Sequence, residues 1–190
     1  AGGHYYFNEA EYSDAVRKGL DWMVANQGSK GGLIGTHDKG GYSVYHKHYM
    51  YEHGIASFAL NEACAIARAL GEPDHSGYRD AAQRGVDFIE DNQHSDGGWR
   101  YTPDLLEKSD TSVTGWQVLA LKAALEAGLA VDEYCIENAR TYFYSRETGE
   151  NGRTGYNNRN VMTDATTGLG MLARQFLFDE ADSPLIPEAS

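Results

Sequence analysis

Side chains that can transfer protons or bind metals gather just before and within residues 50–56. His46 and His48 form an H-x-H pair, and Glu52 directly precedes His53. A carboxylate beside an imidazole can carry out acid–base chemistry, and histidines at such spacing can bind zinc. Glu52 and His53 are therefore candidate catalytic residues, and His46 and His48 are weak candidate zinc ligands. Ordinary packing of loop histidines among aromatic rings is the alternative, and no other cofactor is predicted.

A second group of candidates combines aromatic rings with carboxylates near the start of apolar stretches. Asp110 is a candidate catalytic residue, although an Asp that opens a helix can equally act as an N-cap; Asp164 invites the same interpretation. Aromatic rings can stabilise a carbocation, stack on a sugar or simply pack. The candidate ligand-binding residues are Tyr49, Tyr51, Trp99, Tyr101, Trp116, Tyr156 and Asp164.

These candidates are positioned by an internal repeat. The phrase NQHSDGGW at residues 92–99 follows the same pattern as NQGSKGGL at residues 26–33, with Gly31-Gly32 aligned on Gly97-Gly98. A third, degraded copy begins near Cys135 and ends in a glycine-aromatic segment at 152–156. Internal repeats of this length indicate a repeat architecture.

A second repeated element follows each of these phrases. Segments that open with Gly54, Gly115 and Gly168 align with one another, and glycines here would allow neighbouring helices to approach closely. Each unit is therefore a helix, a glycine-containing loop and a second helix. The pattern predicts six helices, at residues 12–27, 50–70, 78–93, 111–127, 133–146 and 164–178.

The two kinds of helix differ in polarity. The first helix of a unit is amphipathic, with Val16, Leu20 and Met23 opposite charged residues, whereas the second is apolar nearly all round. Such helices are half exposed and enclosed, respectively. We therefore expect an all-α fold of the α/α-toroid type, with an outer and an inner layer. One domain, 1–190, would contain three repeats at about 12–70, 78–127 and 133–178.

Residues 84–99 resemble the QW repeat of squalene and terpenoid cyclases, and protein prenyltransferase β-subunits carry related repeats. The resemblance extends over about residues 12–178. The segments at 50–56, 98–101, 110–122 and 172–177 are similar to bacterial squalene-cyclase-like domains described as prenyltransferase or squalene-oxidase repeat proteins. The resemblance implies an α/α toroid, but it does not imply that the chemistry of either enzyme is retained.

The chemistry of both families depends on residues that can be checked. Class II cyclases take a strong acid from an Asp-x-Asp-Asp-Thr-Ala motif, and the corresponding residues 107–112 read EKSDTS, with Ser109 in place of the acid. Prenyltransferases bind zinc through an Asp-x-Cys pair and a histidine. Residues 45–49 resemble only the tyrosine-histidine part, because the loop at 35–41 contains no cysteine. Class II cyclisation is therefore not expected, and the prenyltransferase zinc site is matched only in part.

Composition limits the classes of partner that the chain can have. With 28 acidic and 16 basic side chains the net charge is −12, which argues against a nucleic-acid partner, and no stretch is apolar enough to span a membrane.

The related enzymes have about twice as many helix pairs, so three pairs would form an open or half ring. A homodimer, or repeats of a longer parent protein, would complete it. Residues 31–49 and 2–7 would cover part of the exposed inner face.

Two functions follow from these expectations. The first is a domain without class II cyclase chemistry that binds an apolar, isoprenoid-like ligand or a protein partner on its inner face. The second is an enzyme at the aromatic mouth of the toroid that acts on a glycan, as a lyase or hydrolase, or on an isoprenoid, as a prenyltransferase or cyclase.

Overall fold

The computed structural model describes residues 5–7, 9–28, 32–34, 48–74, 77–102, 108–146 and 152–178. These residues form helices and no strand, apart from isolated bridges between Gln27 and Ile34 and between Gly155 and Met162. The all-α class is thus confirmed, and every predicted helix is present. The helices are α1 (Ser13–Ala25), α2 (Tyr49–Leu70), α3 (Tyr78–Asp91), α4 (Thr111–Glu126), α5 (Glu133–Thr141), the π-helical turn η2 (Tyr142–Arg146) and α6 (Asp164–Phe178).

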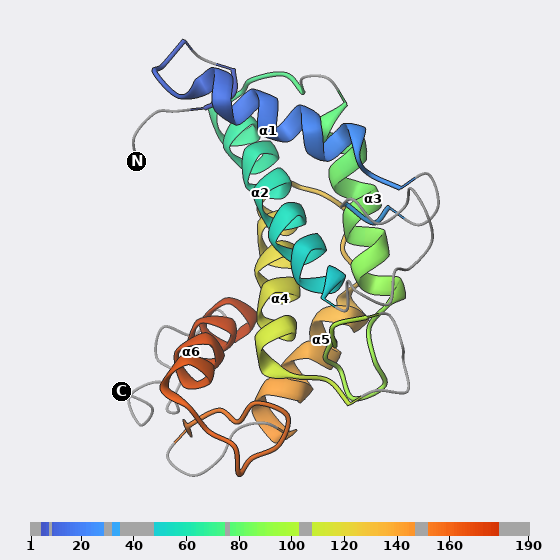
Figure 1. Ribbon diagram of the computed structural model, residues 1–190, viewed down its shortest axis with the longest axis vertical. Helices are drawn as coiled ribbons and strands as arrows, with labels where there is room; N and C mark the ends of the chain where they lie inside the picture. Colours follow the sequence, from blue (N-terminus) through green and yellow to red (C-terminus); the bar gives the residue numbers. More distant parts are fainter. Residues whose placement is uncertain are drawn as a thin grey trace.

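The even-numbered helices pack side by side through the middle of the molecule. α2 packs on α4 and α4 packs on α6, while α3 and α5 each lie against the even-numbered helices on either side of them in sequence. Figure 1 shows α1 at the top, α2 and α4 in the middle and α6 at the lower left. α4 is enclosed as expected, and Val118 and Leu121 are buried. We refer to α2, α4 and α6 as inner helices and to α1, α3 and α5 as outer helices.

A glutamine clamp joins successive outer helices. The Nε2 of Gln27, just after α1, donates to the backbone oxygen of Ala81 in α3 at 2.8 Å. The Nε2 of Gln93, just after α3, donates to the backbone oxygen of Cys135 in α5 at 2.9 Å. Each glutamine therefore bonds to a helical carbonyl of the next repeat as well as to a glycine carbonyl in its own loop, Gly32 or Gly97, which explains why the phrase recurs.

The glycines of the phrase are held against the same outer helices. Gly32 and Gly97 have positive φ angles of 80° and 89°. A Cβ at Gly32 would lie 1.9 Å from the Arg84 oxygen, and a Cβ at Gly97 would lie 2.1 Å from the Asn138 oxygen. Glycine is required on both counts. The predicted alignment of Gly31-Gly32 on Gly97-Gly98 was wrong by one residue, because the first loop is one residue longer and Gly32 corresponds to Gly97.

A third contact recurs in all three repeats. The backbone N–H of Ile34 donates to Nδ1 of His53 at 3.0 Å, and that of Trp99 donates to Oγ1 of Thr114 at 2.9 Å. The N–H of Thr154 donates in the same way to Oγ1 of Thr167 at 3.3 Å. In each repeat the acceptor directly precedes the glycine of the inner helix. This bond therefore ties each loop to the inner helix that follows it.

The inner-helix glycines do not all behave alike. A Cβ at Gly54 would lie 2.5 Å from the Gln117 side chain, and a Cβ at Gly115 would lie 2.5 Å from Leu169. The expected close approach is confirmed at these two positions. It was wrong for Gly168, where an added Cβ would have no neighbour within 4 Å among the described residues.

The segments expected to cover the inner face are described in part. Tyr6 is buried and packs edge-on against Tyr78, with 5.0 Å between the ring centroids. Leu33 and Ile34 are buried as well, whereas residues 35–47 lie outside the described residues. No described helix is both long and apolar enough to cross a membrane.

Candidate functional site

The candidate site lies where α2 and α4 begin, and the loops of the following repeats hold it in place. The backbone N–H of Met50 donates to the backbone carbonyl of Tyr101 at 3.1 Å, and the backbone N–H of Thr111 donates to the backbone carbonyl of Tyr156 at 2.7 Å. Tyr101 and Tyr156 thus occupy equivalent places in two repeats. Because both loops bond to adjacent inner-helix starts, the two tyrosine rings come together beside Tyr51 of α2.

Asp110 is buried at the centre of this group, with no exposed surface. One carboxylate oxygen accepts the N–H groups of Ser112 at 2.9 Å and Val113 at 3.0 Å and also the Ser112 hydroxyl. The other accepts Nη1 of Arg100 at 2.9 Å. The expected N-cap of α4 is confirmed. Every bond described here uses the Asp110 carboxylate as an acceptor, so Asp110 acts as a helix cap and as the ion-pair partner of Arg100.

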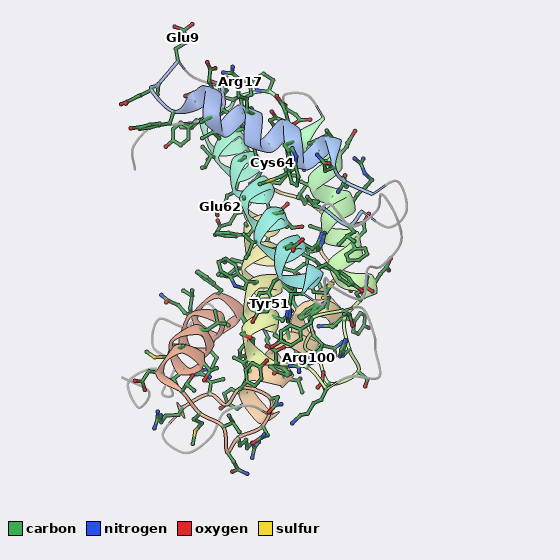
Figure 2. All side chains as sticks on the ribbon, viewed as in Figure 1. Glu9, Arg17, Tyr51, Glu62, Cys64 and Arg100 are labelled. Atoms are coloured by element: carbon green, nitrogen blue, oxygen red, sulfur yellow. The ribbon has the colours of Figure 1, made fainter. Side chains whose placement is uncertain are left out.

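Arg100 is the residue that the sequence analysis missed. Its guanidinium lies 4.3 Å from the centre of the Tyr101 ring and 5.8 Å from that of Tyr156. Its Nη1 also donates to the Tyr156 hydroxyl at 3.2 Å. Burial lowers the pKa of Arg100, but the bond to Tyr156 and the charge of Asp110 outweigh it, so the net shift is upward. A cation between two rings beside a buried carboxylate fixes the geometry of the whole group. Figure 2 labels Arg100 and Tyr51 near the lower end of α2.

The three tyrosine hydroxyls all have partners. Those of Tyr101 and Tyr156 bond to each other, and that of Tyr51 donates to the Ser112 hydroxyl. Burial is the main reason why the pKa of Tyr101 is raised, followed by the bond to Tyr156. Burial likewise raises the pKa of Tyr51. The Tyr51 and Tyr101 phenols therefore remain protonated near neutral pH and act as hydrogen-bonding, aromatic surfaces rather than as bases.

His53 lies apart from this group, in the core. It is fully buried, and its Nε2 donates to the Gly85 oxygen at 3.0 Å while its Nδ1 accepts from Ile34. Burial lowers its pKa to about 4. Since Thr114 and Thr167 occupy the equivalent positions, the geometry favours a structural role for His53.

Three aromatic candidates lie at different depths. Trp99 is fully buried and donates its indole N–H to the Ile89 oxygen at 2.8 Å. Tyr49 is part of the core. Trp116 is only half buried, with its ring centroid 6.4 Å from that of Phe58 on α2. Of the three, Trp116 is therefore the one whose ring can meet a ligand without repacking of the core.

The remaining candidates are on the surface or outside the described residues. Glu52 is exposed in the first turn of α2, and Asp164 is exposed and pairs with Arg153 at 3.3 Å. The expected capping role of Asp164 was wrong: Asp164 is the first residue of α6, and Thr163 accepts the Thr166 N–H at 3.1 Å instead.

The predicted zinc ligands remain a prediction. His48 is exposed and lies edge-on to Tyr101, with 4.5 Å between the ring centroids, and His46 lies outside the described residues. Within the part of the chain that is described, no three His, Cys, Asp or Glu side chains gather closely enough to hold a metal.

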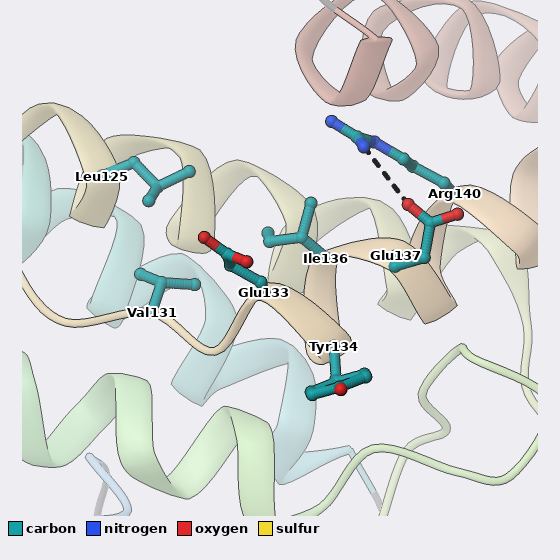
Figure 3. A pocket seen from close by; sticks show the side chains of 7 residues that line it. All are labelled: Leu125, Val131, Glu133, Tyr134, Ile136, Glu137 and Arg140. Atoms are coloured by element: carbon teal, nitrogen blue, oxygen red, sulfur yellow. Dashed lines mark hydrogen bonds and ion pairs between the residues drawn. The ribbon is translucent and has the colours of Figure 1, made fainter.

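A groove lies away from this chemistry, where α4 ends and α5 begins. Its volume is about 580 Å³, and Figure 3 shows the seven side chains that line it. Leu125 and Tyr134 are exposed there, and Glu137 pairs with Arg140 at 3.2 Å within the same helix. The groove brings no candidate catalytic residue together, so the candidate site remains the tyrosine–arginine group.

Comparisons with protein-family models, with curated proteins and with solved structures find no significant match for this chain. The functional argument therefore rests on the residues themselves and on the resemblance of the repeat.

Proposed function

We propose that this chain is a squalene-cyclase-like α/α-toroid domain without class II cyclase chemistry, which binds an apolar, isoprenoid-like ligand on its inner helices. The observation that carries the proposal is the environment of Asp110. Its carboxylate is fully buried, caps α4 and pairs with Arg100, and Ser109 stands where the cyclase acid would be. A site built in this way offers stacking and hydrogen bonding but no strong acid.

The binding surface would begin at Tyr51, Tyr101 and Tyr156 and continue to Trp116 and Phe58. Tyr51 and Phe58 lie two helical turns apart on α2, and Ser112 and Trp116 lie one turn apart on α4, so their side chains share a face. Tyr51 stacks on Tyr101 with 5.7 Å between the centroids. Half-buried aromatic rings of this kind suit the flat, apolar units of an isoprenoid chain.

The test is direct binding of farnesol, measured by isothermal titration calorimetry. Trp116→Ala removes the largest ring of the surface, and a buried aromatic contact contributes about 2 kcal/mol, so affinity should fall roughly 30-fold. Trp22→Ala is the matched control, because Trp22 is 49% exposed on α1. Absence of farnesol binding by the unaltered protein, or equal losses in both variants, would count against the proposal.

The alternative is an enzyme that acts on a glycan or an isoprenoid at the same tyrosine group. The tyrosine hydroxyls and Arg100 are the observation that favours it, since such groups orient sugar hydroxyls. Incubation with acidic polysaccharides and with prenyl diphosphates, followed by mass spectrometry, distinguishes the two. Product formation that is lost in Glu52→Ala would support the enzyme.

A further inference from the structure

Each inner helix fills the groove between the two helices of the next repeat. α2 packs against both α3 and α4, and α4 packs against both α5 and α6. Side-chain bonds fix the first of these fits: Asn61 of α2 donates to the Ala120 oxygen at 2.9 Å, and Gln117 of α4 donates to the Met50 oxygen at 2.8 Å. A groove between an outer and an inner helix is thus built to take an inner helix of the same type.

The groove between α1 and α2 contains no such helix among the described residues. Ala81 and Gly85 of α3 are buried, but the aligned Ala15 and Gly19 of α1 are exposed. A Cβ at Gly85 would lie 3.0 Å from the Ser57 hydroxyl, whereas a Cβ at Gly19 would meet nothing within 4 Å. The face of α3 that packs against α2 is therefore buried, whereas the aligned face of α1 is exposed among the described residues.

The α2 side of this groove shows the same difference. Ala120 and Ala124 of α4, the helix on which α2 packs, are fully buried, and the Ala120 oxygen accepts from Asn61 of α2. The aligned Ala59 and Ala63 of α2 instead line an open groove of about 330 Å³. Its lining is mostly apolar and includes Tyr5, Phe7, Val16, Leu20, Met23 and Ile66. Small residues along both walls leave room for the backbone of another helix.

α6 has the complementary vacancy, since no described repeat follows it. Gly54 of α2 and Gly115 of α4 are closed over by the next inner helix, whereas Gly168 has no neighbour within 4 Å of an added Cβ. Leu172, one turn further along α6, is 37% exposed. Among the described residues, the face that α2 and α4 bury in the next repeat is therefore open on α6.

We infer that α6 of one copy docks into the α1–α2 groove of a second copy. The fit continues an interface that each copy already contains twice, with an inner helix seated between an outer and an inner helix. The contact joins two different surfaces, so it is heterologous and either closes into a ring or extends further. This inference does not depend on the proposed ligand or on any catalytic activity.

Two glycine variants test the contact, one on the groove and one on α6. Gly19→Arg fills the groove and Gly168→Arg covers the open face of α6, and neither added Cβ has a described residue of the same copy within 4 Å. Both positions are helical, where Arg is favoured over Gly by up to about 1 kcal/mol, so the fold should persist. Circular dichroism checks this, and Ala25→Arg on an exposed position at the end of α1 is the control.

Sedimentation velocity gives the outcome. The unaltered protein and Ala25→Arg should sediment at twice the 20.9 kDa of one chain or more, whereas each glycine variant should dissociate at least about 100-fold more readily. Mixing the two variants should restore a pair, through the intact α6 of Gly19→Arg and the intact groove of Gly168→Arg. Monomeric unaltered protein at about 0.2 mM overturns the inference, as does a mixture that stays monomeric.

Discussion

A neutral imidazole is required at His53, because its two ring nitrogens serve one donor and one acceptor of the backbone. Burial lowers its pKa from 6.5 to about 4, so the unfolded chain binds the proton more readily. The contribution of His53 to the free energy of unfolding is therefore fully present above pH 6.5 and is lost as the pH falls toward 4. We expect a loss of about 3 kcal/mol from this residue, measured by urea unfolding at several pH values.

His53→Gln provides the comparison for this prediction. Gln is neutral at all these pH values, and the other titrating groups are common to both proteins. The free energy of unfolding of the variant should therefore change less between pH 6.5 and pH 4 than that of the unaltered protein. If the free energies of unfolding of the two proteins changed equally with pH, His53 would not take up a proton when the protein unfolds, and the prediction would be wrong.

Single residues of the site were predicted unevenly from the sequence. Tyr51, Tyr101, Tyr156 and Asp110 lie close together as expected, because each opens or precedes a predicted inner helix. Arg100 was missed, although its place beside Trp99 in a repeated loop was a usable signal. The sequence makes His53 a candidate catalytic residue because it follows Glu52. The sequence does not reveal that its Nδ1 accepts a hydrogen bond from the backbone N–H of Ile34.

At the scale of elements, the glutamine clamp should contribute measurably to stability. Gln93→Ala removes two partly buried bonds, to the Gly97 and Cys135 oxygens at 3.0 and 2.9 Å. We expect a loss of about 1–3 kcal/mol in urea unfolding. In dilute protein, Gln175→Ala, on an exposed position of α6, should change stability by less than about 0.5 kcal/mol. Equal losses would mean that the clamp does not join the repeats.

The inner-helix glycines allow a second prediction, with opposite signs at two aligned positions. Gly115→Ala places a Cβ 2.5 Å from Leu169 and should destabilise the protein by about 1–3 kcal/mol through overpacking. Gly168→Ala meets nothing within 4 Å and should stabilise α6 by up to about 1 kcal/mol. Thermal unfolding of dilute protein measures both. A destabilising Gly168→Ala would show that α6 is covered within one copy.

The helices themselves were predictable because their sequence signals repeat. α2 and α6 were expected at 50–70 and 164–178 and are observed at Tyr49–Leu70 and Asp164–Phe178. Loop details were less accessible, since one inserted residue before Gly32 shifts the alignment without changing the pattern of residue types. Gly168 matched its counterparts in sequence but not in contacts, because contacts depend on which repeat lies next to it.

At the scale of the whole molecule, the net charge of −12 opposes any contact between two copies. The walls of the α1–α2 groove are mostly apolar, so the repulsion between copies is long-range and screened by salt. If α6 of one copy docks in this groove, the dissociation constant should fall about tenfold between roughly 0.05 and 0.5 M NaCl, because the Debye length shortens from about 14 to about 4 Å. Gly19→Arg should remain dissociated at both concentrations, which separates docking in the groove from general salting-out. Association that weakens with salt would instead mean that ion pairs hold the copies together.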